Sequence, residues 1–174
     1  MSRNGKGKEA RAAEGGRRHD IEIQVRINGE PRQWRIAPGD LLLDVLRREG
    51  YFGVKRGCET GECGCCTVLL NDQPVNSCLI FAAQANGCAI TTVEGVARGD
   101  TLDPVQQSFL DHGASQCGFC TPGMILSTKA LLREHPHATE EQVREMLAGN
   151  FCRCGTYFGM RGALAQLGAR KGGA

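Results

Sequence analysis

Four of the ten cysteines of this chain fall within one short segment. The segment Gly57 to Thr67, GCETGECGCCT, contains Cys58, Cys63, Cys65 and Cys66. Thiols this close together can bind a metal, close disulfides or act as nucleophiles. The question for the sequence is which chemistry this spacing favours, and which cysteine is the extra one.

The spacing Cys58-x4-Cys63-x2-Cys66 is that of a plant-type [2Fe-2S] loop. A loop that surrounds a cluster must turn tightly and direct backbone N–H groups at sulfur, and glycine permits both. The glycines are Gly57, Gly61 and Gly64. The basic pair at 55–56 is expected to offset the negative charge of the cluster. Cys78, on the expected returning strand of the next hairpin, is the best fourth ligand, which leaves Cys65 over.

The alternatives for this first set are weaker. Structural zinc sites favour two short C-x2–4-C pairs, which the x4-x2 spacing does not provide. Disulfides are expected in exported chains, and the N-terminal residues contain no apolar signal segment. The chain offers no plausible nucleophile and base pair. Cys88 is expected to be a small buried apolar side chain rather than a ligand.

A second set of four cysteines lies further along the chain. Cys117 and Cys120 form a C-x2-C pair, and Cys152 and Cys154 form a C-x-C pair. Each pair is adjacent to an expected helix end, where helix N-terminal amides would lower the pKa of a thiol. Spacing alone fits a cluster, zinc or a redox dithiol. A redox C-x-x-C motif normally accompanies a βαβ pattern, which is absent here.

The elements around the first set predict a small α+β domain over residues 19–95. Residues 21–27 alternate apolar and polar side chains, Asn28-Gly29 indicates a hairpin turn, and 31–37 returns as a strand. Asp40 is expected to cap a helix that follows it. Three further strands are expected, at residues 66–70, 75–80 and 89–95.

From residue 103 the pattern changes to helices, which predicts an all-α four-helix domain over residues 103–168. Asp103 with Pro104, and Thr121 with Pro122, resemble helix starts, and Thr139 to Gln142 forms a capping box. A fourth helix is expected after CRCGTY. Residues 96–102 are the expected linker, 1–18 a disordered basic tail and 169–174 a flexible tail.

Composition excludes several classes of protein. The formal net charge of +2 argues against a dedicated nucleic-acid binder, which usually carries a strongly basic face. No apolar run approaches the ~20 residues of a membrane span, so direct membrane insertion is not expected. Arg17-Arg18 is followed by a strand pattern rather than an apolar helix, which disfavours an export signal. We therefore expect a cytoplasmic protein.

Four motifs in order, GCETGECGCCTVLL, VNSCL, QCGFCTPGMI and AGNFCRCGTY, resemble the iron–sulfur subunit of the molybdenum hydroxylase (xanthine oxidase) family. The resemblance spans about residues 20–165. It implies a plant-ferredoxin-like β-grasp domain followed by a four-helix domain, each with one [2Fe-2S] cluster. Two positions depart from the common family pattern: Cys65, where a small residue is usual, and CRCGTY in place of CRCTGY.

By this resemblance, Cys58, Cys63, Cys66 and Cys78 hold a first cluster nearer FAD. A second cluster, nearer the molybdenum cofactor, is held by Cys117, Cys120, Cys152 and Cys154. Gln116 and Cys154 would lie against the molybdopterin.

The implied function is to pass single electrons from molybdenum through both clusters to FAD. Molybdenum and FAD would be bound by a large and a medium partner subunit, in a heterotrimer or a dimer of heterotrimers. This chain would then be the iron–sulfur subunit of an oxidoreductase, without a complete active site of its own. The alternatives are a free-standing [2Fe-2S] electron carrier and a structural zinc protein.

Overall fold

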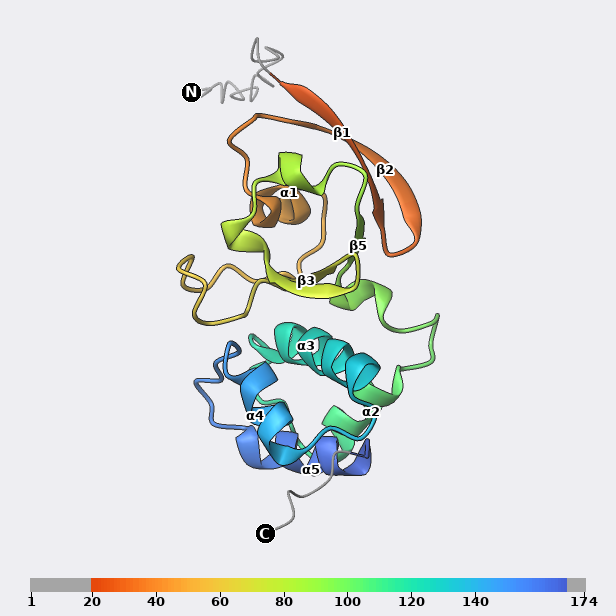
Figure 1. Ribbon diagram of the computed structural model, residues 1–174, viewed down its shortest axis with the longest axis vertical. Coiled ribbons are helices and arrows are strands. Elements are labelled where there is room, and N and C mark those ends of the chain that lie inside the picture. The colour runs from red at the N-terminus through yellow and green to blue at the C-terminus, as the bar shows by residue number, and fades with distance from the viewer. Residues whose placement is uncertain (1–19, 169–174) are drawn as a thin grey trace, which may run out of the picture.

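The fold is α+β, with a mixed sheet at one end of the molecule and four helices at the other (Figure 1). The computed structural model describes residues 20–168. Strands β1 (Ile21–Ile27) and β2 (Glu30–Ile36) form the predicted antiparallel hairpin. Its turn places Asn28 at φ 51° and Gly29 at φ 90°. Asparagine and glycine tolerate this left-handed conformation, which the two-residue turn requires.

The sheet has the order β2-β1-β5-β3-β4 and is mixed. β3 (Thr67–Leu70) pairs antiparallel with β4 (Gln73–Asn76) and with β5 (Ala89–Thr91), whereas β5 pairs parallel with β1. The short helix α1 (Leu42–Arg48) packs its four buried side chains into the core of this half. A helix across a mixed sheet is the predicted β-grasp arrangement.

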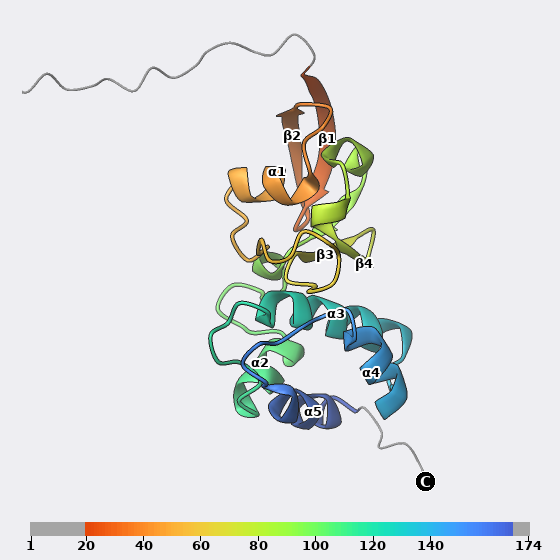
Figure 2. The same cartoon turned by 90° about the vertical axis from the view of Figure 1, so that its left-hand side faces the viewer.

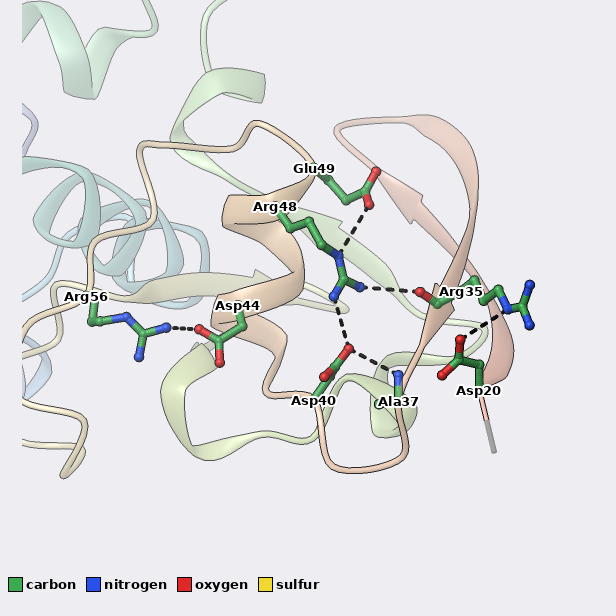
Figure 3. A network of polar contacts seen from close by, with 8 residues as sticks. All are labelled: Asp20, Arg35, Ala37, Asp40, Asp44, Arg48, Glu49 and Arg56. Carbon is green, nitrogen blue, oxygen red and sulfur yellow. Dashed lines mark hydrogen bonds and ion pairs between the residues drawn. The ribbon is translucent and has the colours of Figure 1, made fainter. Parts of the chain in front are cut away.

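Asp40 does not cap α1, so this prediction was wrong. The N-cap residue is Leu41, which makes no side-chain cap hydrogen bond. Asp40 Oδ2 instead accepts hydrogen bonds from Ala37 N–H at 3.1 Å and from the Arg48 guanidinium at 3.2 Å (Figure 3). The carboxylate therefore closes the preceding turn and holds it to the far end of the helix.

Cys78 follows the hairpin but does not lie on a strand. After β4 the chain enters a 3-10 turn, η1 (Ser77–Leu79), and then a second one, η2 (Ala82–Ala85). The returning strand predicted at 75–80 therefore begins and ends too late, because β4 spans Gln73–Asn76. At this point the Ser77 N–H and hydroxyl both donate to the C=O of Cys66, the residue before β3. A third 3-10 turn, η3 (Val93–Gly95), follows β5.

The second half consists of four helices, as predicted. Their bounds are α2 (Pro104–Asp111), α3 (Thr121–Glu134), α4 (Glu140–Leu147) and α5 (Tyr157–Gln166). Asp103 caps α2 by accepting from Val105 N–H at 3.0 Å, and Thr139 and Gln142 form the predicted capping box of α4. At α3 the N-cap residue is Cys120 instead of Thr121, whose hydroxyl contacts Ser115 Oγ at 2.9 Å.

The two halves share a core. Helix α3 packs against β3, β4 and η3, and Figure 2 shows it lying directly below the sheet. Cys65 and Leu69 from the first half are buried in the same apolar cluster as Phe109 and Met124 from the helices. A cluster built from both halves resists their separation, because parting them would expose apolar surface to water.

The predicted tails at 1–18 and 169–174 lie outside the described residues, and the domain boundaries at 19–95, 96–102 and 103–168 stay predictions. Across residues 20–168, none of the helices combines the length and apolar character that a bilayer crossing requires.

Candidate metal centres

The loop between α1 and β3 places Cys58 and Cys63 beside each other. Cys58 Sγ accepts from the N–H groups of Thr60 and Cys63, and Cys58 N–H donates to Cys63 Sγ, all at 3.4 Å. The side-chain and backbone hydrogen bonds of Thr60 lower the pKa of Cys58 to about 6. The loop is therefore shaped to stabilise a thiolate, which is the form that binds metals.

Cys66 and Cys78 complete the first set. Burial raises the pKa of Cys78 to about 11, and the adjacent thiols of Cys66 and Cys58 act in the same direction. These interactions show that Cys78 lies beside Cys66 and Cys58 of the loop. Asn76 fixes the approach, because its Nδ2 donates to Gly61 C=O at 2.9 Å and so ties the end of β4 to the loop.

Cys65 lies between the first set and the helices. Its side chain is 5% exposed and belongs to the apolar cluster shared with the helices. Its thiol donates to Cys63 C=O at 3.7 Å. Burial raises the pKa of Cys65 to about 12, with further contributions from Cys63 and Cys120. Cys65 therefore lies between the two sets, packed in the shared apolar cluster, and the spacing of the loop leaves it outside the four candidate ligands of the first set.

The basic pair before the loop is engaged in local contacts. Arg56 forms ion pairs with Asp44, as Figure 3 shows, and with Glu59. Lys55 Nζ donates to Phe52 C=O at 2.6 Å. The predicted charge compensation by Arg56 is therefore reduced by two neighbouring carboxylates. The backbone amides directed at Cys58 remain the nearest source of positive potential at the loop.

The second set forms where the N-terminus of α3 meets the loop between α4 and α5. Cys120 is the buried N-cap residue of α3, and Cys152 is buried beside the Thr156 hydroxyl, 3.2 Å from its Sγ. Burial alone would raise the pKa of Cys152, but the hydrogen bonds of the Thr156 side chain and backbone lower it to about 7. Cys152 N–H also donates to Tyr157 Oη at 2.8 Å.

Cys117 and Cys154 form the exposed side of the second set. The backbone N–H of Phe119 lowers the pKa of Cys117, and the Cys154 side chain is a hydrogen-bond neighbour of the same thiol. Cys120 is similarly beside Cys152. The structure thus brings all four predicted residues together, and it leaves Gln116 exposed next to Cys117.

The thiols of both sets lie beside one another in pairs, as Cys66 with Cys78 and Cys120 with Cys152 show. This pairing fits a cluster whose four thiolates are divided between two irons. The loop is also shaped around sulfur: a Cβ built at Gly57 would lie 2.7 Å from Cys63 Sγ.

Sequence reasoning missed Asn150, and it misjudged Cys88. Asn150 is buried and donates to Gly64 C=O, so it joins the first loop to the segment that carries Cys152. Its only signal in the sequence is its position, two residues before CRCG. Cys88 is half-buried instead of buried, with its thiol near the carbonyl groups of Gln84 and Asn86.

Two family models match the chain, one to each half. The "2Fe-2S iron-sulfur cluster binding domain" matches residues 25–86, and the "[2Fe-2S] binding domain" matches residues 92–165.

Among curated proteins, the chain is 46% identical over 145 residues to the nicotinate dehydrogenase small FeS subunit of Eubacterium barkeri, covering 83% of this chain and 92% of that one. It is 49% identical over 140 residues to the xanthine dehydrogenase iron-sulfur-binding subunit of Escherichia coli O157:H7, covering 79% and 87%. Among solved structures, a chain of quinoline 2-oxidoreductase from Pseudomonas putida 86 matches with a TM-score of 0.81 and 44% identity, covering 84% of this chain and 91% of that one.

The assignment of Cys65 can be tested against that of its neighbour. We expect Cys65→Ala to keep both clusters and to cost about 1 kcal/mol of stability, because only one buried sulfur is removed. Cys66→Ala should lose the first cluster alone. Iron content and the electron paramagnetic resonance (EPR) spectrum of the reduced protein measure both outcomes. Loss of the first signal in the Cys65 variant would overturn the ligand assignment.

Gly57 offers a second test, because its lack of a side chain leaves room for sulfur. Gly57→Ala should lower first-cluster occupancy strongly, since the new methyl would contact Cys63 Sγ. Gly39→Ala is the matched control, because a Cβ there meets no atom within 4 Å among the described residues. Iron per chain and visible absorption measure the difference. Equal occupancy in the two variants would contradict the proposed role of Gly57.

Proposed function

Because the chain belongs to the iron–sulfur subunits of the molybdenum hydroxylase (xanthine oxidase) family, we propose that it relays single electrons from a molybdenum cofactor through two [2Fe-2S] clusters to FAD. Molybdenum and FAD are assigned to a large and a medium partner subunit. The observation that carries the proposal is the presence of two four-cysteine sets on one continuous packed unit.

Each [2Fe-2S] cluster, when bound, accepts and returns one electron. Cys58, Cys63, Cys66 and Cys78 are assigned to the first cluster, and Cys117, Cys120, Cys152 and Cys154 to the second. The chain's own contribution is to fix these thiols and to stabilise their anionic form. It does so with the amides directed at Cys58 Sγ, and with Thr156 and the N-terminus of α3 near the second set.

The second set has the surface expected of a docking site for the molybdenum subunit. Four exposed aromatic side chains are close in sequence to its cysteines: Phe119, Phe151, Tyr157 and Phe158. Exposed aromatic clusters beside a functional group are typical of interfaces. Gln116 and Cys154, which are exposed on the same loops, are proposed to contact the molybdopterin.

The first set has an apolar margin of its own, which we assign to the FAD subunit. Leu79 and Phe81 are exposed after Cys78, and Phe52 is exposed just before the loop. Leu79 lies directly against the loop, because a Cβ built at Gly61 would be 2.7 Å from its Cδ1. Two separate apolar margins favour a chain held between two partners, in a heterotrimer or a dimer of heterotrimers, over a free-standing carrier. A cytoplasmic location remains part of the proposal.

Metal analysis with EPR on the purified native complex tests the relay. Two clusters require about four iron atoms per chain, two distinguishable signals on reduction, and molybdenum in the same complex. About two iron atoms would mean that one ligand set is wrongly assigned. A colourless protein with zinc would contradict both iron–sulfur interpretations, and an iron-loaded chain that purifies without any partner would favour the free carrier.

The aromatic margin of the second set provides a separate prediction. Phe158 is 90% exposed, so Phe158→Ser should leave the fold and both clusters intact. We expect it to weaken association with the large subunit by roughly tenfold, as the loss of an interface aromatic commonly does. Ile21→Ser, at an exposed position on β1, is the control. Co-purification yield against complex concentration measures both, and equal yields would exclude Phe158 from the interface.

A further inference from the structure

The two ligand-bearing segments meet at one backbone contact. Phe151 N–H donates to Cys63 C=O at 2.9 Å. Cys63 belongs to the first set, and Phe151 immediately precedes Cys152 of the second. One hydrogen bond therefore joins the main chain of a first-set residue to the residue that precedes a second-set cysteine, although Cys63 and Phe151 are 88 positions apart in the sequence.

The contact is close because glycines line it. A Cβ built at Gly64 would lie 2.2 Å from Gly149 C=O, and one at Gly123 would lie 2.2 Å from Gly64 C=O. Gly64 also has φ 62°, which side chains rarely allow. The first loop thus reaches the main chain of both α3 and the segment before Cys152 with no side chain between them.

Asn150 holds this contact with its side chain. Asn150 is 5% exposed, and both the nitrogen and the oxygen of its side-chain amide form hydrogen bonds. Nδ2 donates to Gly64 C=O at 3.1 Å and to Thr67 Oγ1 at 3.4 Å, while Oδ1 accepts from Ser127 Oγ at 2.8 Å. One side chain therefore joins the first loop, β3 and α3. A buried amide that is paired at both ends specifies one geometry, because any shift leaves a polar group unpaired.

We propose that Asn150 is a positioning residue for electron transfer between the two clusters: it fixes the first ligand loop against the second ligand segment at the Phe151–Cys63 hydrogen bond. The inference rests on the proposed relay function and adds to it the residue that sets the inter-cluster geometry. Electron tunnelling depends steeply on distance and on the medium between donor and acceptor. A clamp at this contact therefore controls the rate without touching either ligand set.

The step that Asn150 serves is a one-electron exchange. With both clusters bound, the cluster held by Cys117, Cys120, Cys152 and Cys154 would lose one electron and the cluster held by Cys58, Cys63, Cys66 and Cys78 would gain it, in the proposed direction from molybdenum to FAD. No covalent bond forms or breaks, and Asn150 neither gains nor loses an electron or a proton. Its contribution is limited to geometry, so its removal should change the coupling between the clusters more than the properties of either cluster.

Two variants test the clamp, and a third controls for them. Asn150→Ala removes all three side-chain hydrogen bonds. Thr67→Val removes a hydroxyl that donates to Gly64 C=O at 2.7 Å and accepts from Asn150, with little change in shape. Thr128→Val is the matched control: it makes the same exchange at a buried position on α3, where Oγ1 has no hydrogen-bond partner within residues 20–168.

The measurements are made on the purified native complex. Iron content and the separate EPR signals check that both clusters are present. The magnetic splitting between the two reduced clusters at low temperature and the rate of inter-cluster electron exchange after rapid reduction report the coupling. Hydrogen–deuterium exchange of the peptide containing Phe151 reports the backbone contact itself.

We expect Asn150→Ala to keep its iron, to change the splitting, to expose the Phe151 amide to exchange, and to slow electron exchange by roughly tenfold, as misplacement of reacting groups commonly does. Thr67→Val should change the same readouts less, and Thr128→Val should match the parent. If Asn150→Ala does not accumulate, the positioning role is tested by comparing the splitting and the electron-exchange rate of Thr67→Val with those of Thr128→Val.

Unchanged splitting and exchange rate in iron-replete Asn150→Ala, or identical behaviour of the two Thr→Val variants, would overturn the positioning role. A parent complex without two [2Fe-2S] signals would instead contradict the proposed function, and with it the inference.

Discussion

The close approach of the first ligand loop to the segment before Cys152 is the constraint on which the rest of the structure depends. The Phe151 N–H to Cys63 C=O hydrogen bond requires the main chains to touch, and Gly64 and Gly123 leave the space for it. A main-chain contact cannot adapt by changing a rotamer, so both halves must be held rigidly on either side of it. The shared apolar cluster, which includes Cys65, provides that rigidity.

A shared core also explains why two small halves behave as one body. A domain of about 60–75 residues buries a limited share of its surface and is marginally stable alone. Here Leu69 of β3 and Phe109 of α2 contribute to the same cluster, so each half completes the core of the other. Ligand geometry across the junction is therefore stabilised by the free energy of folding of both halves. A flexible linker between two independent domains could not give a fixed geometry.

Local signals in the sequence predicted most of the helices and strands. They could not predict contacts between residues that are distant in the sequence. The Asn28-Gly29 turn and the Thr139 capping box depend on neighbouring residues alone, so their sequence signatures were sufficient. Asp40 has a residue type that commonly caps helices. Its carboxylate instead accepts a hydrogen bond from Arg48, at the other end of α1. The pairing of Gly64 with Asn150 spans 86 positions and leaves no local pattern, which is why Asn150 was missed.

Cys65 shows how the surroundings decide the role of a residue when spacing leaves it open. In the sequence it is one of four closely spaced cysteines that could each be a ligand. In the structure its side chain is buried in the apolar cluster, near Cys120. Burial raises the pKa of its thiol to about 12, as it does for Cys120, so the packing and spacing of Cys65 rather than its pKa distinguish it from the candidate ligands. A charged or polar side chain at this position would have to be buried at the junction. A small neutral thiol can fill it without disturbing the potential at either ligand set.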